Sequence, residues 1–134
     1  MELNYKTPEN FATWFLEPIG ETAHAYEGYI LKYGLLLAKA YHLVELGVIN
    51  ASPIYRKKKY LVLVYPPNEE GKRKYQYVGN KPEKVEDALE KVERYKELAA
   101  VMVQLDDICM IMGMARNRLL SFLSLADQHK CLSE

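Results

Sequence analysis

The feature that most constrains the fold is a change of hydrophobic period along the chain. From about residue 21 to 46, apolar residues recur every three or four positions, which is the spacing of one helix face. Between residues 54 and 79 this spacing gives way to β-branched and aromatic runs such as Leu61–Tyr65, which are typical of strands. A second helical pattern begins at Pro82. We therefore expect two long helical segments with a β-hairpin between them.

Local signals set the expected element boundaries. Thr7 and Pro8 form a helix start, because a hydroxyl N-cap precedes a proline at the first helical position, and Pro18 is expected to end that helix. Gly47 is expected to be the C-cap of the helix that ends at residue 46. A break is expected at Gly113, since an unbroken helix would be about 65 Å long. The expected order is helix 8–17, helix 21–46, hairpin 54–79, helix 82–112 and helix 114–128.

Length and composition indicate one soluble domain. The chain has 134 residues, of which 49% are hydrophobic and 27% charged, so we expect a single domain over residues 1–134. Its class is expected to be mainly α with a β-hairpin (α+β), a helical bundle with a protruding two-stranded ribbon. Two isolated cysteines suit a reducing compartment. The apolar stretches 29–48 and 98–115 are interrupted by charges, which predicts a cytoplasmic protein without a membrane span.

The strand segment carries almost all of the charge asymmetry. The formal net charge is zero, yet residues 54–81 hold eight basic and two acidic residues, whereas residues 1–53 and 82–134 are each net −3. Five of the eleven tyrosines fall in the same segment. A basic patch interleaved with aromatics predicts a surface for DNA or RNA, with cations on phosphates. The predicted contact residues are Arg56, Lys57, Lys58, Lys59, Tyr60, Lys72, Arg73, Lys74, Tyr75, Tyr77 and Lys81.

Alternation along the strands predicts two unlike faces. Arg73, Tyr75 and Tyr77 should share one face of their strand, because side chains alternate with a period of two. One face of the hairpin can then lie on a helix while the other shows cations and tyrosine rings. The rings could stack on single-stranded bases, or the ribbon could enter a duplex major groove.

The same residues fit two other interpretations. Lysines on an edge hairpin also block pairing between strands of different molecules, without any ligand. Alternatively, the basic hairpin could dock on an acidic protein, which would make the chain an adaptor or inhibitor within a larger protein complex.

Residues Gly71–Gly79, followed by Pro82–Val85 and the helix to Leu98, resemble a hairpin-plus-helix module of small bacterial proteins of unknown function. Such proteins are often encoded near transposases and on mobile elements. More distantly, the segment is similar to the arm-type DNA-binding domain of phage-like integrases, in which a small sheet backed by a helix presents basic residues to DNA. The resemblance covers less than a third of the chain. It departs from the integrase arm in showing only two clear strands, and the sequence carries no recombinase catalytic domain. The resemblance implies a DNA-binding protein associated with mobile elements.

The sequence signals for a catalytic or metal site are weaker than those for the basic patch. Glu21 and His24 have the spacing found in di-iron bundles, but a second such pair is missing from the sequence. Asp106 and Asp107 are expected to form ion pairs within the bundle, and Cys109 is expected to be a buried, inert thiol. The sequence has neither a P-loop nor a dinucleotide motif. We therefore expect a non-enzymatic, nucleic-acid-binding accessory protein without a metal or cofactor.

The helical segments have more apolar surface than one chain of this size can cover. Tyr26–Val44 and Val85–Phe122 are both rich in large apolar residues. Four of the five methionines lie between Met102 and Met114, which indicates an adaptable packing surface. We expect a homodimer or larger assembly that shares the helical faces.

Overall fold

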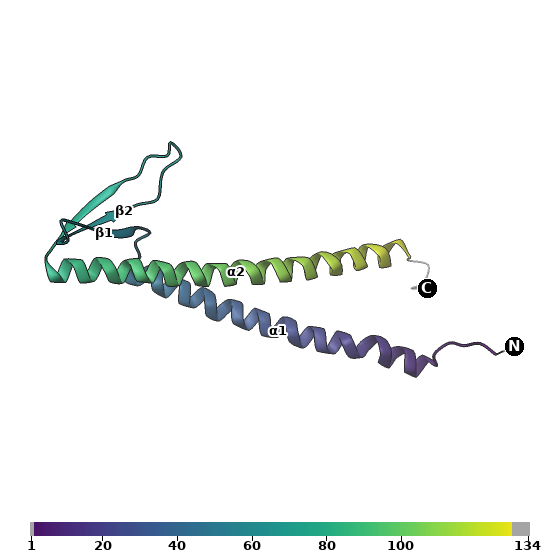
Figure 1. The fold of residues 1–134 in the computed structure, drawn as a ribbon. Coiled ribbons are helices and arrows are strands. Elements are labelled where there is room, and N and C mark those ends of the chain that lie inside the picture. The colour runs from purple at the N-terminus through teal and green to yellow at the C-terminus, as the bar shows by residue number, and fades with distance from the viewer. Residues whose placement is uncertain (1, 130–134) are drawn as a thin grey trace. The chain divides into compact units, whose positions relative to one another are not determined.

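The computed structural model describes residues 2–129 and contains two long helices and three strands (Figure 1). The mainly helical α+β class expected from the sequence is confirmed. In chain order the elements are α1 (Pro8–Leu46), β1 (Ser52–Arg56), β2 (Tyr60–Val64), β3 (Tyr75–Gly79) and α2 (Pro82–Gln128).

The chain divides into two compact units. The sheet unit is Leu36–Asp106, which contains the end of α1, the three strands and the first half of α2. The helical unit is Met1–Leu35 with Asp107–Glu134, which contains the first part of α1 and the second part of α2.

Both expected helix breaks are wrong. Pro18 lies inside α1, so the expected helices 8–17 and 21–46 are one helix of 39 residues. A proline inside a helix removes one backbone donor and crowds the carbonyl four residues earlier, which costs about 3 kcal/mol, but the remaining hydrogen bonds of a 39-residue helix can offset this cost. Likewise α2 runs through Gly113 for 47 residues, so the expected helices 82–112 and 114–128 are also one. A helical glycine costs only about 1 kcal/mol relative to alanine, which is too little to end a helix with good helix formers on both sides.

The sheet has three antiparallel strands in the order β1-β2-β3. The expected two-stranded ribbon is therefore wrong, because its first strand is two strands joined by a tight turn at Lys57–Lys59. The Lys59 N–H donates to the Arg56 carbonyl at 3.1 Å, and Lys57 and Lys58 have φ angles of 55° and 56°. Positive φ at both central residues is the signature of a type I′ turn, which joins hairpin strands.

The β2–β3 loop is ordered by Asn68. Its side-chain oxygen accepts hydrogen bonds from the N–H groups of Glu70 and Lys72, at 3.0 and 2.9 Å. The Asn68 N–H donates to the Lys72 carbonyl at 2.8 Å, and Gly71 has a φ of 80°. A turn that ends on a left-handed glycine is a common hairpin connection, and glycine adopts this conformation without a steric penalty.

The core of the sheet unit lies between β2 and α2. Leu61 and Leu63 are completely buried against Ala88 and Val92. Figure 1 shows the labelled strands β1 and β2 along the first part of α2. A register shift between Leu61 and Val62 leaves Val78 as an extra residue in β3. The central strand is thus fixed on the helix by two leucines on one of its faces.

Arg94 of α2 holds the C-terminal end of α1. Its guanidinium donates to the carbonyls of Leu46 and Gly47, at 2.8 and 3.1 Å, and lies 3.4 Å from the Glu90 carboxylate. Gly47 has a φ of 95°, which confirms it as the C-cap. A charged donor from α2 therefore satisfies the carbonyl of Leu46, the last residue of α1, and that of Gly47 directly after it.

Replacing Arg94 with alanine should lower the free energy of unfolding by about 2 kcal/mol, because hydrogen bonds to charged groups contribute about that much. Urea denaturation followed by circular dichroism measures the change. The matched control is Lys96→Ala, which removes an exposed ion pair with Glu93 on the same helix and should change stability by less than about 0.5 kcal/mol. Equal effects of the two variants would show that the cap contributes nothing.

By length and composition, α2 is the one helix among residues 2–129 that is apolar enough to cross a membrane. An 18-residue window in it has a mean hydropathy of 1.6, and 17% of that window is buried. Core helices of soluble proteins pass the same test of length and composition, but they are mostly buried.

Candidate nucleic-acid interface

The structure divides the predicted basic patch into two clusters at opposite ends of β2. The turn cluster consists of Arg56, Lys57, Lys58, Lys59 and Lys81. The first four residues precede the start of β2, and Lys81 follows Gly79, which pairs with Leu61 near that same end. The loop cluster consists of Lys72, Arg73 and Lys74. These three residues lie beyond the pair of Val64 and Tyr75, at the other end of β2. Five strand residues, or about 15 Å, separate the clusters.

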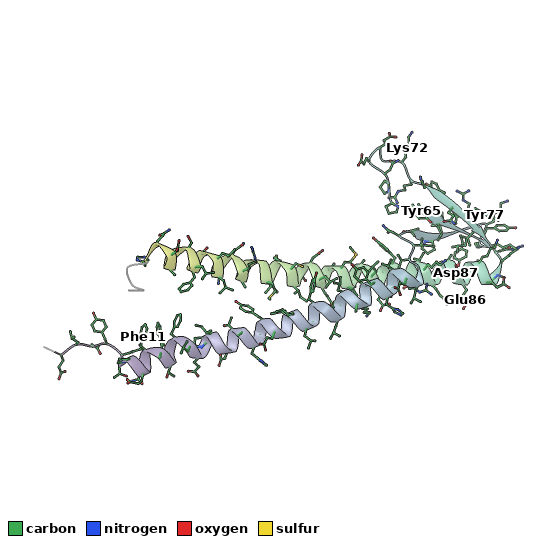
Figure 2. All side chains as sticks on the ribbon, turned by 180° about the vertical axis from the view of Figure 1, so that it is seen from behind. Phe11, Tyr65, Lys72, Tyr77, Glu86 and Asp87 are labelled. Atoms are coloured by element: carbon green, nitrogen blue, oxygen red, sulfur yellow. The ribbon has the colours of Figure 1, made fainter. Side chains whose placement is uncertain are left out.

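The two clusters differ in their own acidic content. The turn cluster carries five cations, and none of residues 54–60 is acidic. The loop cluster follows Glu69 and Glu70 in the same loop, so residues 69–74 have three cations and two carboxylates. Figure 2 shows Lys72 far out on this loop, away from Glu86 and Asp87 on α2. Counted over its own segment, the turn cluster is the more strongly positive of the two, although Glu83 and Glu86 follow Lys81 at the start of α2.

Within residues 2–129, none of these eight cations forms an ion pair. Four acids of the first half of α2 are paired with other residues of the helices, whereas Glu83 and Glu86 form no ion pair within the described residues. Asp87 pairs with Lys91 at 3.0 Å, and Glu97 pairs with Lys39 of α1 at 2.9 Å. The positive charge of the sheet segment is thus available to an outside anion.

The outer face of the sheet carries the tyrosines. Leu61 and Leu63 point towards α2, so the alternate residues Tyr60, Val62 and Val64 lie on the opposite face. Register places Tyr77 beside Val62 and Tyr75 beside Val64, so the two tyrosines share one face as predicted. The two β3 tyrosines are 66% and 58% exposed, respectively. Arg73, which was expected on the same face, lies in the loop before β3 and lines a cavity with Val92 and Tyr95 of α2.

The rings lie close to the turn cluster. Tyr60 and Tyr77 form a tilted pair with ring centroids 6.1 Å apart, and the Lys59 ammonium lies 5.6 Å from the centroid of the Tyr60 ring. A cation beside exposed rings combines a phosphate contact with a surface for stacking.

Strand β1, which the sequence did not reveal, adds two residues to this face. Ile54 pairs with Val62, and Arg56 pairs with Tyr60, so both lie on the outer side of the sheet. Val62 is only 2% exposed, although it lies on this face. The β-branched and aromatic pair Ile54-Tyr55 was the available signal, but the turn that follows lacks the usual Asn-Gly or Asp-Gly.

The turn cluster is strained. Lys57 and Lys58 both occupy the left-handed region, which costs roughly 1–2 kcal/mol per residue for side chains other than glycine and asparagine. Strain of this kind gathers at functional sites, where the side chain has a role beyond stability. Two lysines at the positions that favour asparagine and glycine therefore mark the turn as a candidate contact.

The other candidate residues are separate from this surface. In the part of the chain that the structure describes, no group of three or more His, Cys, Asp or Glu could hold a metal. Asp106 and Asp107 are exposed, and neither forms an ion pair with another residue between 2 and 129. The expectation of ion pairs within the bundle is therefore wrong. Cys109, expected to be buried, is exposed. Cys131 lies outside the described residues.

The fold and this surface define an α+β protein with a basic, tyrosine-bearing three-stranded sheet packed on a long helix. No protein-family model matches the chain, and neither a curated protein nor a solved structure is significantly similar to it.

Proposed function

We propose that this protein binds nucleic acid without catalysis, through the outer face of the sheet and the turn cluster beside it. The observation that carries the proposal is that all eight cations of residues 54–81 are free of ion pairs within the described chain. Phosphates bound there would displace only water and counterions, which is the usual source of affinity for a nucleic acid.

Electrostatic asymmetry supports the same surface. The segments on either side of the sheet each carry a net charge of −3, while residues 54–81 carry +6. A polyanion is attracted by one region and repelled by the others, which orients its approach. The exposed rings of Tyr75 and Tyr77 then offer surfaces on which nucleic-acid bases can stack.

The third strand brings the sheet unit closer to the arm-type integrase domains that the sequence resembles. The sequence showed two strands, whereas β1, β2 and β3 form a small sheet backed by α2. Under this proposal, duplex DNA is one ligand, and the protein has an accessory role on a mobile element and lies in the cytoplasm.

Titration with labelled oligonucleotides tests the proposal. Duplex and single-stranded probes of about 20 nucleotides should bind at about 50 mM KCl, and the dissociation constant should rise about a hundredfold at about 200 mM if about four phosphates are contacted. Fluorescence anisotropy measures both constants. Absence of binding at low salt, or affinity that does not change with salt, would contradict the proposal.

Charge reversal then locates the surface. Lys58→Glu with Arg73→Glu should weaken binding at least tenfold, because each variant side chain repels a phosphate. Lys32→Glu is the matched control for Lys58→Glu alone, since it makes the same charge change on α1 in the helical unit and should leave affinity within about twofold. A pull-down from lysate that survives nuclease treatment, with no binding to the oligonucleotides, would instead support the acidic protein partner.

A further inference from the structure

The helical unit has almost no core of its own. Ten hydrophobic residues are buried in the described chain, and Ile108 is the one that lies in the helical unit. Its largest apolar side chains are exposed: Trp14, Leu16 and Leu31 of α1 and Leu119, Phe122 and Leu123 of α2 are all at least 55% accessible. Helices in water derive most of their stability from burial of an apolar face. These helices therefore require a partner.

The exposed area has the magnitude of a permanent interface. The chain exposes 11290 Å² at a mass of 15.5 kDa. A folded monomer of this mass exposes about 7200 Å². The excess is about 4000 Å² for one chain. Obligate homodimers bury up to about 5000 Å² in total, or about 2500 Å² from each chain, so one further copy would cover more than half of this excess.

A groove within the helical unit shows where the partner would insert. Trp14, Ile19 and Tyr26 of α1 line it together with Leu119 and Phe122 of α2, and its volume is about 700 Å³. Large aromatic side chains around an apolar groove are typical of interface centres.

Charge distinguishes a second copy from a lipid bilayer. The α1 side of the helical unit has five acidic and two basic residues in positions 1–35, with Glu17, Glu21 and Glu27 inside the helix. Each charge would be costly in hydrocarbon. The α2 side carries Arg116 and Arg118 together with Asp107 and Asp127, so it is balanced in charge where the α1 side is acidic. In a twofold dimer with α1 of one copy against α2 of its partner, the two arginines lie on the helix that faces the acidic residues of α1.

We infer that the helical unit is a homodimerisation surface, in which α1 and α2 of two copies form one four-helix core. In this geometry, apolar stripes from four helices meet and the interspersed charges remain at the rim. The inference does not depend on nucleic-acid binding, because the interface and the basic sheet belong to different units.

Sedimentation equilibrium on the full chain tests the dimer. At about 10 µM, the wild-type protein should have twice the mass of one chain, and its melting temperature should rise with concentration. A monomer, or an assembly larger than a dimer, overturns the inference. Flotation with vesicles of phosphatidylcholine and phosphatidylglycerol tests whether the apolar surface binds a membrane instead. Co-flotation of the protein with the vesicles would also overturn the inference of a homodimer.

A matched pair of variants locates the interface. Phe122→Glu should raise the dimer dissociation constant at least a hundredfold, because it places a charge in the apolar groove. Val44→Glu introduces the same charge at a 53% exposed position of α1 in the sheet unit and should leave the protein dimeric. Equal behaviour of the two variants overturns the assignment. If Phe122→Glu loses helicity, the wild-type mass still decides the oligomeric state.

Discussion

Replacing Leu63 with alanine should lower the free energy of unfolding of the sheet unit by about 3 kcal/mol. Leu63 is completely buried between β2 and α2, in contact with a core that includes Leu61, Ala88 and Val92. Truncation removes apolar contacts and leaves a cavity, and buried leucines replaced in this way cost about 2–5 kcal/mol. Urea denaturation followed by circular dichroism, at one fixed protein concentration, measures the loss.

The control for this variant is Ile54→Ala on the outer face of the sheet. Ile54 is 40% exposed, so its replacement with alanine should lower the free energy of unfolding by less than about 1 kcal/mol. Comparison of the two variants tests which face of the sheet contributes more to stability, because Ile54 pairs with Val62 on the outer face and Leu63 lies on the helix-facing side. If Ile54→Ala were as destabilising as Leu63→Ala, the helix-facing side would not be the main core of the sheet unit.

The two faces of the sheet were predictable because they depend on local alternation. Leu61 and Leu63 alternate with Tyr60 and Val62, and a period of two assigns these residues to opposite faces whatever the rest of the chain does. The long helices were predictable for the same reason, since their apolar period continues over many turns. The continuity of the two helices through Pro18 and Gly113 was not predictable, because the local cost of one proline or glycine can be offset by the remaining hydrogen bonds of a long helix.

The arrangement of the cations was not predictable from local patterns. A run of three lysines gives no sign of a turn, because type I′ turns favour asparagine and glycine, so β1 was merged with β2. Once β1 is a separate strand, Lys57 and Lys72 lie at opposite ends of β2 and no longer form one patch. Whether the cations are neutralised by their own helices depends on tertiary distances, which the sequence does not contain.

Replacing Lys57 with asparagine and Lys58 with glycine should change stability and affinity in opposite directions. Both positions have positive φ, so the double variant should gain about 1–2 kcal/mol of unfolding free energy. It also loses two cations, so the affinity for duplex DNA should fall about tenfold or more. The slope of log K against log salt should become shallower by about 1.8. Urea denaturation and anisotropy titrations on the same preparation measure the two changes.

Two further variants separate strain from charge. Lys57→Gln with Lys58→Gln removes the same charges but retains the unfavourable φ angles, so it should lose affinity without a gain in stability. Lys72→Gln with Lys74→Gln removes two cations from the loop cluster, beside Glu69 and Glu70, and should weaken binding less. If the lysines only prevented edge-to-edge strand pairing, the asparagine–glycine variant would be more stable, would bind DNA unchanged and would aggregate more readily. A fall in affinity together with a gain in stability would therefore indicate that the strained turn is maintained for its charge.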